Sequence, residues 1–414
     1  MNRPSRSFRG QRTITLLLAT CISLALLAAC RGPSDSASNS LTATSPATAA
    51  GGSAATLTST APATATPAAT ATSAATPTPA PTGTSVGTAT VTTAPAATAT
   101  PLPDGSTGEV KYLDDRSTAA AVIDSYYRAI NAKQYARAYS YWEPNTPADQ
   151  LPPFDQFQQG YATTTSVQVT IGDVGGGAAA GNLYFSVPVM LQSATTDKGD
   201  ETFVGCYTLH IGNPANQTEP PFESLAIQKA SVTQVTGEQS AKDLLDTVCA
   251  DQGSAQPPQL GTPSENPNDI SADRYLDDRT NGVEELRSYY NAINRKEYAR
   301  AYGYWEPNTP ADQLPAFNDF RNGYADTASV ALTVGAPVND AGAGQLYTSI
   351  PATIVATMTD GSTQTFVGCY TTHLAQPTNQ AEPPFHPLGF QRANVGKVDN
   401  SADTATLMAS VCKP

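Results

Sequence analysis

The sequence predicts an α+β fold with antiparallel strands, present in two tandem copies after a disordered stalk. Three observations predict this architecture. A long N-terminal stretch lacks residues that could form a core, the remainder repeats itself at a constant offset, and each repeat changes from helical to strand-like hydrophobic spacing. The chain has 414 residues, of which about three hundred have a composition that can fold, enough for two domains.

The first thirty residues have the layout of an export signal. Four arginines precede an apolar run, residues 14–27, which is short for a membrane span and ends in small side chains. The junction LAAC, ending at Cys30, resembles the lipobox of bacterial lipoproteins. This resemblance implies removal of residues 1–29 and a lipid attached to Cys30 that anchors the chain to a membrane. The alternative is an ordinary cleaved signal peptide with an incidental cysteine.

Residues 30–108 are expected to form a disordered stalk rich in Ala, Thr, Pro and Ser. No charged residue occurs from Ser36 to Pro103, and no Phe, Tyr or Trp from Gly10 to Lys111, so this stretch has nothing with which to bury a core. Its prolines favour an extended chain. A bare spacer and a stalk that carries O-linked sugars both fit this composition.

The rest of the chain is one domain duplicated. YLDDR begins at Tyr112 and again at Tyr275, an offset of 163, and the same offset relates two occurrences of YWEPNTPADQLP and of TFVGCYT. Over fifty positions from each of these tyrosines, 33 are identical, which indicates a shared fold. We place copy 1 at residues 109–252, a linker containing Pro and Gly at 253–272, and copy 2 at 273–414.

Within each copy, helices are expected before strands. In copy 1, apolar residues recur at helical spacing over 123–130 and 135–142, Pro144 is expected to end the second helix, and a third helix follows Pro153. The segments SVQVTI, NLYFSVPVML, ETFVGCYTLHI and LAIQKASVTQV are typical of strands, and SAKDLLDTVC is typical of a short final helix. The three glycines at 175–177 are expected in a hairpin loop.

This order of elements, with SYYRAINAKQYARAYSYW and FDQFQQGYA and their counterparts in copy 2, resembles the nuclear-transport-factor-2-like superfamily. In that superfamily a curved sheet wraps around helices to form a cone with an apolar pocket. The resemblance implies a cone-like fold for each copy, but the superfamily holds isomerases, cyclases, dehydratases and binding modules, so fold does not choose an activity. Aromatic side chains that could line such a pocket, or form ordinary core, are Tyr126, Tyr127, Tyr139, Trp142, Tyr161, Tyr289, Tyr290, Tyr302, Trp305 and Tyr324.

The four cysteines that follow Cys30 are expected to form disulfides, because export places them in an oxidising compartment. A bond retained in both copies must close within each copy, which favours Cys206–Cys249 and Cys369–Cys412. The alternative is a zinc site, because each copy has a histidine four residues after its first cysteine, on the same face of a strand. No fourth matched ligand is apparent, so no metal is expected.

Candidate catalytic residues are few. Glu143 and Glu306 follow the expected second helix of each copy, and His210 and His373 lie on an expected strand, so each of the four could act as a base in a pocket. No nucleophile elbow, dinucleotide fingerprint or metalloprotease helix occurs. We therefore assign no residue of this chain a catalytic role by analogy with the superfamily, and we expect no cofactor.

The expected function is that of a lipoprotein, anchored through Cys30 to the extracytoplasmic side of a bacterial membrane. The two copies are expected to pack on each other and to act as a non-catalytic module that binds a small apolar ligand or an envelope protein. The net charge of −13, which becomes −17 without the four signal arginines, argues against nucleic-acid binding. The alternatives are an exported isomerase- or hydrolase-like enzyme that uses the cone pocket, and a purely structural envelope protein.

Overall fold

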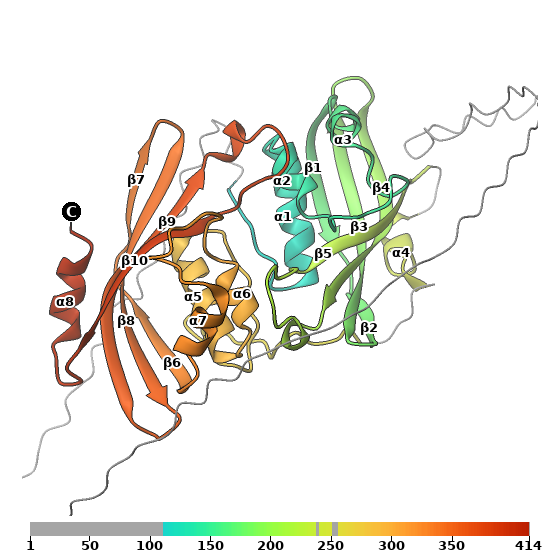
Figure 1. Cartoon of the computed structure of the whole chain (residues 1–414). Helices are drawn as coiled ribbons and strands as arrows, with labels where there is room; N and C mark the ends of the chain where they lie inside the picture. The colour runs from blue at the N-terminus through green and yellow to red at the C-terminus, as the bar shows by residue number, and fades with distance from the viewer. Residues whose placement is uncertain (1–110, 237–239, 251–255, 414) are drawn as a thin grey trace, which may run out of the picture. The chain divides into compact units, whose positions relative to one another are not determined.

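The computed structural model describes residues 111–236, 240–250 and 256–413. These residues form an α+β structure with two antiparallel sheets, each preceded by three helices and followed by one (Figure 1). The predicted α+β class and the tandem repeat are confirmed. The expected signal peptide, the expected lipidation of Cys30 and the expected stalk all concern residues outside those that the structure describes.

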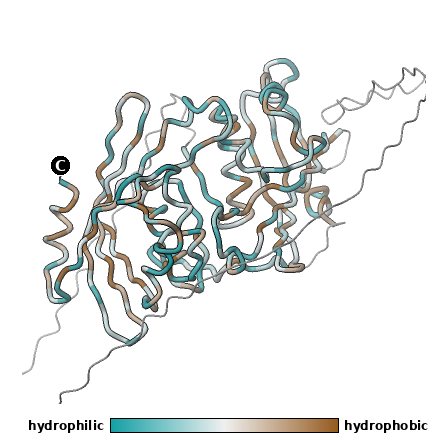
Figure 2. Tube along the Cα trace, in the orientation of Figure 1, coloured by the Kyte–Doolittle hydropathy of each residue, from teal (hydrophilic) through white to brown (hydrophobic). Residues whose placement is uncertain are grey.

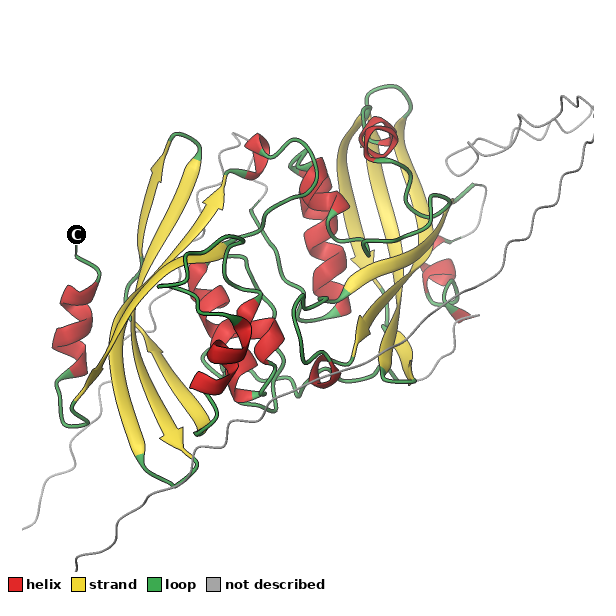
Figure 3. Cartoon of the chain, in the orientation of Figure 1, coloured by secondary structure: helices red, strands yellow, loops and turns green. Residues whose placement is uncertain are grey.

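Copy 1 follows the predicted order of helices and then strands (Figure 3). Its elements are α1 (Ala119–Asn131), α2 (Tyr135–Tyr139), α3 (Phe154–Gly160), β1 (Thr164–Ile171), β2 (Gly175–Ala179), β3 (Asn182–Thr195), β4 (Gly199–Gly212), the 3₁₀ turn η1 (Pro214–Asn216), β5 (Ala226–Gln234) and α4 (Ala241–Leu245).

Copy 2 repeats this order. Its elements are α5 (Gly282–Asn294), α6 (Tyr298–Tyr302), α7 (Phe317–Gly323), β6 (Thr327–Val334), β7 (Val338–Gly342), β8 (Gln345–Met358), β9 (Thr363–Ala375), the 3₁₀ turn η3 (Pro377–Asn379), β10 (Gly389–Val398) and α8 (Thr404–Val411).

The two sheets have the same topology. In copy 1 the strand order is β1-β3-β4-β5, with β2 paired to β3, and in copy 2 it is β6-β8-β9-β10, with β7 paired to β8. The long central pairs have matched registers, with Val187 opposite Tyr207 and Ile350 opposite Tyr370. In copy 2, α5 and α8 lie on opposite faces of the sheet (Figure 1).

The long first helix of each copy begins at a side-chain cap. Thr118 accepts a hydrogen bond from the Ala121 amide, and Asn281 accepts from the amides of Val283 and Glu284, so both helices start at the corresponding position. The apolar face of each helix is buried against its sheet, and hydrophobic positions recur along the strands that cover it (Figure 2).

Two local predictions were wrong. The second helix, α2, ends at Tyr139 and not at the Pro144 stop, and Trp142 instead forms a parallel bridge to Ile227. Residues 175–177, expected in a hairpin loop, lie in strand β2. Gly176 has φ +153°, and a Cβ atom there would lie 2.2 Å from the carbonyl oxygen of Tyr184. Glycine therefore permits β2 to pair closely with β3 at this position, although glycine has a low propensity for strands.

The predicted disulfide pairing is confirmed. Cys206 is bonded to Cys249 and Cys369 to Cys412, each over a separation of 43 residues. Each bond connects a central strand to the helical segment at the C-terminal end of its copy. Among the described residues, no helix is both long and apolar enough to cross a membrane.

Candidate functional site

A histidine and a glutamate that are distant along the chain meet in copy 1. His210 lies on β4, and Glu143 lies in the turn after α2, where its amide donates to the carbonyl of Ile227 on β5 (3.0 Å). Nδ1 of His210 is 2.5 Å from Oε1 of Glu143, across 67 positions of sequence. The turn after α2 therefore carries the carboxylate to the sheet.

The second nitrogen of the same imidazole ring is also occupied. Nε2 of His210 is 2.9 Å from Oδ1 of Asn182, at the start of β3. Tyr184 is directly opposite His210 in the β3–β4 register, and the two rings stack with centroids 4.8 Å apart. The His210 side chain is 20% exposed and the Glu143 side chain 25%, so the pair lies at the edge of the core.

Copy 2 repeats the arrangement. Nδ1 of His373 binds Oε1 of Glu306, and Nε2 lies 2.6 Å from Oε1 of Gln345, the residue at the Asn182 position. Tyr347 stacks on the ring with centroids 4.7 Å apart. The sequence did not predict these contacts because the partners are distant along the chain, and Asn182 and Gln345 are different residues. The matching positions of the glutamate and the histidine in the two copies were the signal that it offered.

The chemistry available to each histidine–glutamate pair is limited by its partners. An imidazole oriented by a carboxylate is an arrangement suited to proton transfer. In both copies, however, the second ring nitrogen binds a side-chain amide, so a substrate would have to displace Asn182 or Gln345 to reach it. In the structure, each histidine–glutamate pair, together with the side-chain amide on the histidine, links the turn after the second helix to two neighbouring strands.

The aromatic candidates for a pocket are brought together in the core of each copy. The Tyr126 and Tyr161 hydroxyls are 2.9 Å apart, and those of Tyr127 and Tyr207 are 2.6 Å apart. Burial raises the pKa of Tyr126 and of Tyr127 well above the usual value for tyrosine. Tyr139 packs edge-to-face on Phe157 and its hydroxyl donates to the carbonyl of Pro152, 3.2 Å away.

The corresponding residues of copy 2 make the same contacts. The Tyr289 and Tyr324 hydroxyls are 2.8 Å apart, and those of Tyr290 and Tyr370 are 2.5 Å apart. The indole rings of Trp142 and Trp305 are buried in the two cores. In each copy these tyrosines satisfy one another's hydroxyl groups, as buried tyrosines require.

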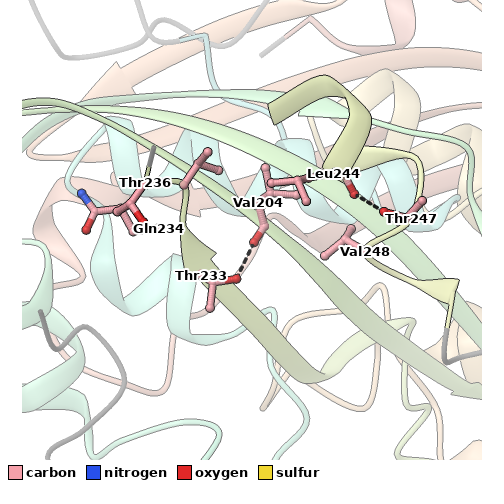
Figure 4. Close-up of a pocket in the computed structure, with 8 residues that line it drawn as sticks. Val204, Thr233, Gln234, Thr236, Leu244, Thr247 and Val248 are labelled. Carbon is pink, nitrogen blue, oxygen red and sulfur yellow. Dashed lines mark hydrogen bonds between the residues drawn. The ribbon is translucent and has the colours of Figure 1, made fainter. Parts of the chain in front are cut away.

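A small cavity lies elsewhere, in copy 1. Its volume is about 210 Å³, and it lies between β4, β5 and the segment that begins with α4 (Figure 4). Ligand pockets usually measure roughly 300–1,000 Å³. None of the aromatic candidates lines the cavity, whose walls include Val204, Thr233, Gln234, Leu244, Thr247 and Val248.

The two copies contact each other through the YLDDR segments that precede α1 and α5. Asp115 and Asp278 form an antiparallel bridge. The Arg116 amide donates to the carbonyl of Asp277 and the Arg279 amide to that of Asp114, both at 2.7 Å. These contacts are reciprocal, as in an interface with twofold symmetry.

Side chains complete this contact. The Asp114 amide donates to Oγ1 of Thr280 (3.2 Å), and the Asp277 amide donates to Oγ of Ser117 (2.8 Å). Tyr112 belongs to a buried cluster that includes Leu346 and Leu374 of copy 2, and Tyr275 belongs to the core cluster of copy 1. Each copy therefore contributes one tyrosine to a buried cluster formed mainly by residues of the other copy.

Charged groups are buried at the same place. Tyr141 donates to Asp114 and Tyr304 to Asp277, both at 2.8 Å. Burial is the main cause of the raised pKa of Asp115. The pKa of Asp278 is raised mainly by burial and, as the second largest cause, by the negative charge of Asp115. The identity of the YLDDR segment in the two copies is the sequence signal for this interface, which its residue types alone do not predict.

The alternative zinc site is excluded at these cysteines, because all four are oxidised to disulfides and offer no thiolate. Each nearby histidine binds a glutamate and a side-chain amide instead.

In comparisons with known proteins, no family model, no curated protein and no solved structure matches this chain.

Proposed function

We propose that this protein is a membrane-anchored extracytoplasmic lipoprotein whose tandem domains form a non-catalytic module for binding a ligand or another protein. The LAAC junction at Cys30 supports lipid anchoring, and the stretch from Ser36 to Pro103 supports a stalk that holds the domains away from the membrane. Two disulfides are consistent with an extracytoplasmic protein.

Each copy is, in this proposal, a cone-like domain related to the nuclear-transport-factor-2-like superfamily. The support is the order of three helices followed by an antiparallel sheet, with the first helix packed on that sheet. The reciprocal contacts of Asp114, Asp115, Asp277 and Asp278 support a covalent pseudo-dimer of the two copies.

The observation that carries the non-catalytic assignment is the occupation of both nitrogens in each candidate histidine. A general base needs a nitrogen or oxygen within hydrogen-bond reach of the proton that it removes. His210 and His373 use both nitrogens on protein partners, and the candidate tyrosine hydroxyls at positions 126, 161, 289 and 324 pair with one another.

Anchoring is tested by comparing the full chain with a Cys30→Ala variant in an exporting bacterial host. The unaltered chain should incorporate labelled fatty acid and sediment with membranes, and the variant should do neither. Equal labelling of the two proteins would contradict the proposed lipid site.

Native mass spectrometry of the released Cys30→Ala chain then tests binding, because a retained ligand adds a mass that disappears on denaturation, whereas a bare mass directs the search to a protein partner.

A second candidate function is an exported isomerase- or hydrolase-like enzyme that uses the histidine–glutamate pairs. The observation that favours it is the 2.5 Å contact between His210 and Glu143 and its repetition in copy 2. Replacing His210, Glu143, His373 and Glu306 together by glutamine should then abolish any turnover found by screening ester and ketone substrates. Turnover that survives in the fourfold variant would exclude these residues as the catalytic groups.

A further inference from the structure

One row of inward-facing side chains differs in polarity between the two copies. In copy 2 the row crosses three neighbouring strands, β7, β8 and β9 (Figure 1). Asn339 is directly opposite Thr348, and Thr348 is directly opposite Thr372. Oγ1 of Thr348 donates to Oδ1 of Asn339 (2.9 Å), so these two side chains meet on one face of the sheet. The row therefore runs from an exposed residue, Asn339, to a fully buried one, Thr372.

Helix α5 lies against the buried end of this row. A Cβ atom at Gly282, the first residue of α5, would lie 2.7 Å from Oγ1 of Thr372 and 3.3 Å from Cβ of Thr348. Glu285 follows Gly282 by three residues, so its side chain leaves the helix on the same side. Glu285 and Thr372 are both 0% exposed. The buried carboxyl and the end of the row are thus on facing surfaces of the helix and the sheet.

A second set of contacts places the Glu285 carboxyl beside the strand that flanks Thr372. Oε1 of Glu285 is 3.2 Å from Nη1 of Arg279, and the same nitrogen donates to the carbonyl of Leu388 (2.7 Å). Leu388 directly precedes β10, in which Phe390 is directly opposite Thr372. The carboxyl and the Thr372 hydroxyl therefore lie in the same part of the core.

Copy 1 has no polar side chain at the equivalent positions. The five equivalent pairs are Ala119 and Gly282, Val122 and Glu285, Gly176 and Asn339, Phe185 and Thr348, and Leu209 and Thr372. The row in copy 1 has the same register, with Gly176 opposite Phe185 and Phe185 opposite Leu209, so the side chains differ while the pairing is retained.

The exchange of apolar for polar side chains stops at the next inward-facing positions. Val187 in copy 1 corresponds to Ile350 in copy 2, and Tyr207 corresponds to Tyr370. All four of these side chains are buried. The added polar groups are thus confined to one place in the core of copy 2.

Two oxygen atoms at this place, Oε2 of Glu285 and Oγ1 of Thr372, have no hydrogen-bond partner among the described residues. A buried oxygen without a partner costs free energy, and the apolar pair in copy 1 avoids that cost. Buried water molecules satisfy such groups in many proteins, and each makes about three hydrogen bonds. Thr348 is also much smaller than Phe185, which fills the corresponding space in copy 1.

We propose that copy 2 holds a water molecule between Oε2 of Glu285 and Oγ1 of Thr372, and that the row from Asn339 connects this water to the solvent. The water accepts from the threonine hydroxyl and donates to the carboxylate, so both oxygens are paired. Through it the carboxyl exchanges its proton with the solvent while the domain stays folded. The same place in copy 1 is dry. This inference goes beyond the proposed binding function and does not depend on it.

The charged groups around Glu285 lie outside the row. Burial raises the pKa of Glu285 to about 8, the charge of Arg279 lowers it, and the charges of Glu306, Asp114 and Asp277 raise it further. The carboxyl is therefore protonated at pH 6. Substitutions in the row leave all of these charges in place, so a change in the behaviour of the carboxyl reports on its hydration.

Infrared spectroscopy of the purified full chain at pH 6 tests the proposal. The C=O stretching band of the protonated Glu285 carboxyl is identified by its loss in Glu285→Gln, and it shifts when deuterium replaces the proton after transfer to deuterium oxide. Thr372→Val removes the hydroxyl that holds the water and should slow this shift about tenfold. A loss of stability would accelerate exchange, so slowing is not a result of damage to the fold. Equal rates in Thr372→Val and in the unaltered chain would overturn the proposal.

Thr353→Val is the matched control. Thr353 on β8 is also buried and its hydroxyl also lacks a partner, but it is five residues from Thr348 and so points to the opposite face of the sheet. This variant should leave the rate unchanged. The pH at which the Glu285 band is lost gives a second readout. It should rise by about one pH unit in Thr372→Val, because hydrogen bonds to the ionised form are lost, and stay constant in Thr353→Val. Equal midpoints in the two variants would contradict the bridging water.

A carboxyl introduced into copy 1 provides the dry reference. Val122→Glu places a carboxyl at the helix position of Glu285, where Phe185 and Leu209 exclude water. The band of the introduced carboxyl should shift about tenfold more slowly than that of Glu285. Adding Phe185→Thr and Leu209→Thr, which supply the hydroxyls of copy 2, should bring the rate close to that of Glu285. Exchange of the introduced carboxyl as fast as that of Glu285 in the single variant would show that the row of copy 2 does not admit the water.

Discussion

Glu285 on α5 is a buried carboxylate at a position where copy 1 has Val122, and replacing it by valine should change how stability depends on pH. Both side chains are fully buried. Oε1 of Glu285 is 3.2 Å from Nη1 of Arg279, and Oε2 has no hydrogen-bond partner among the described residues. Burial raises the pKa of Glu285 from 4.5 to about 8, although the charge of Arg279 acts in the opposite direction.

The size of the effect follows from this pKa. The folded chain holds the proton at pH values where the unfolded chain has released it, so the contribution of Glu285 to stability is complete below pH 4.5 and is lost as the pH rises through about 8. The difference between the two pKa values is about 3.5, and each unit corresponds to about 1.36 kcal/mol. The unfolding free energy should therefore lose up to about 5 kcal/mol over this range through Glu285 alone.

Urea unfolding of the unaltered chain and of Glu285→Val at pH 4.5 and pH 8.5 measures this loss. The difference in unfolding free energy between the two proteins should move in favour of the variant by several kcal/mol between the two pH values, since other titrating groups cancel in the comparison. Val122→Glu is the matched control in copy 1 and should acquire a similar loss of stability at high pH. A difference between Glu285→Val and the unaltered chain that is the same at both pH values would refute the reasoning.

Three further predictions concern the contact between the copies and the disulfides. Asp278→Asn should stabilise the chain at pH 7 and have no effect near pH 3. Burial and the charge of Asp115 raise the pKa of Asp278, so the contribution of its protonated form to stability is lost as the pH rises. Urea unfolding at the two pH values measures this, and a difference in unfolding free energy between variant and unaltered chain that is the same at both would contradict it. Replacing Cys206 and Cys249 by serine should cost about 4 kcal/mol for a closed loop of this length, again by urea unfolding, and an unchanged midpoint would contradict that value. A protease site introduced at residues 251–255 should allow the chain to be cut while the copies still co-elute in gel filtration, whereas separate elution would show that the YLDDR contacts do not hold the copies together.

Much of the fold could be predicted because its signals are local. Helical spacing over 123–130 and β-branched or aromatic runs such as NLYFSVPVML predict elements that the structure contains at those places. Strand β2 was missed because its glycines favour loops, whereas its place in the sheet comes from its pairing with β3. The equivalent strand β7 of copy 2 pairs with β8 in the same register, with Asn339 at the Gly176 position. The end of α2 was predicted too late in the sequence. Trp142 leaves the helix to form a bridge to Ile227, a residue distant along the chain, and no residue near Pro144 indicates that bridge.

The sequence by itself determined the duplication, the order of helices and strands, and the pairing of the four cysteines. These follow from an offset that recurs along the chain and from a symmetry that any retained disulfide must obey. Only the tertiary structure decided that His210 meets Glu143, that Asp115 faces Asp278, and that Glu285 is buried where Val122 is its counterpart. Such contacts depend on strand register and on how distant segments pack, and burial sets the energy of a charge only once that packing exists.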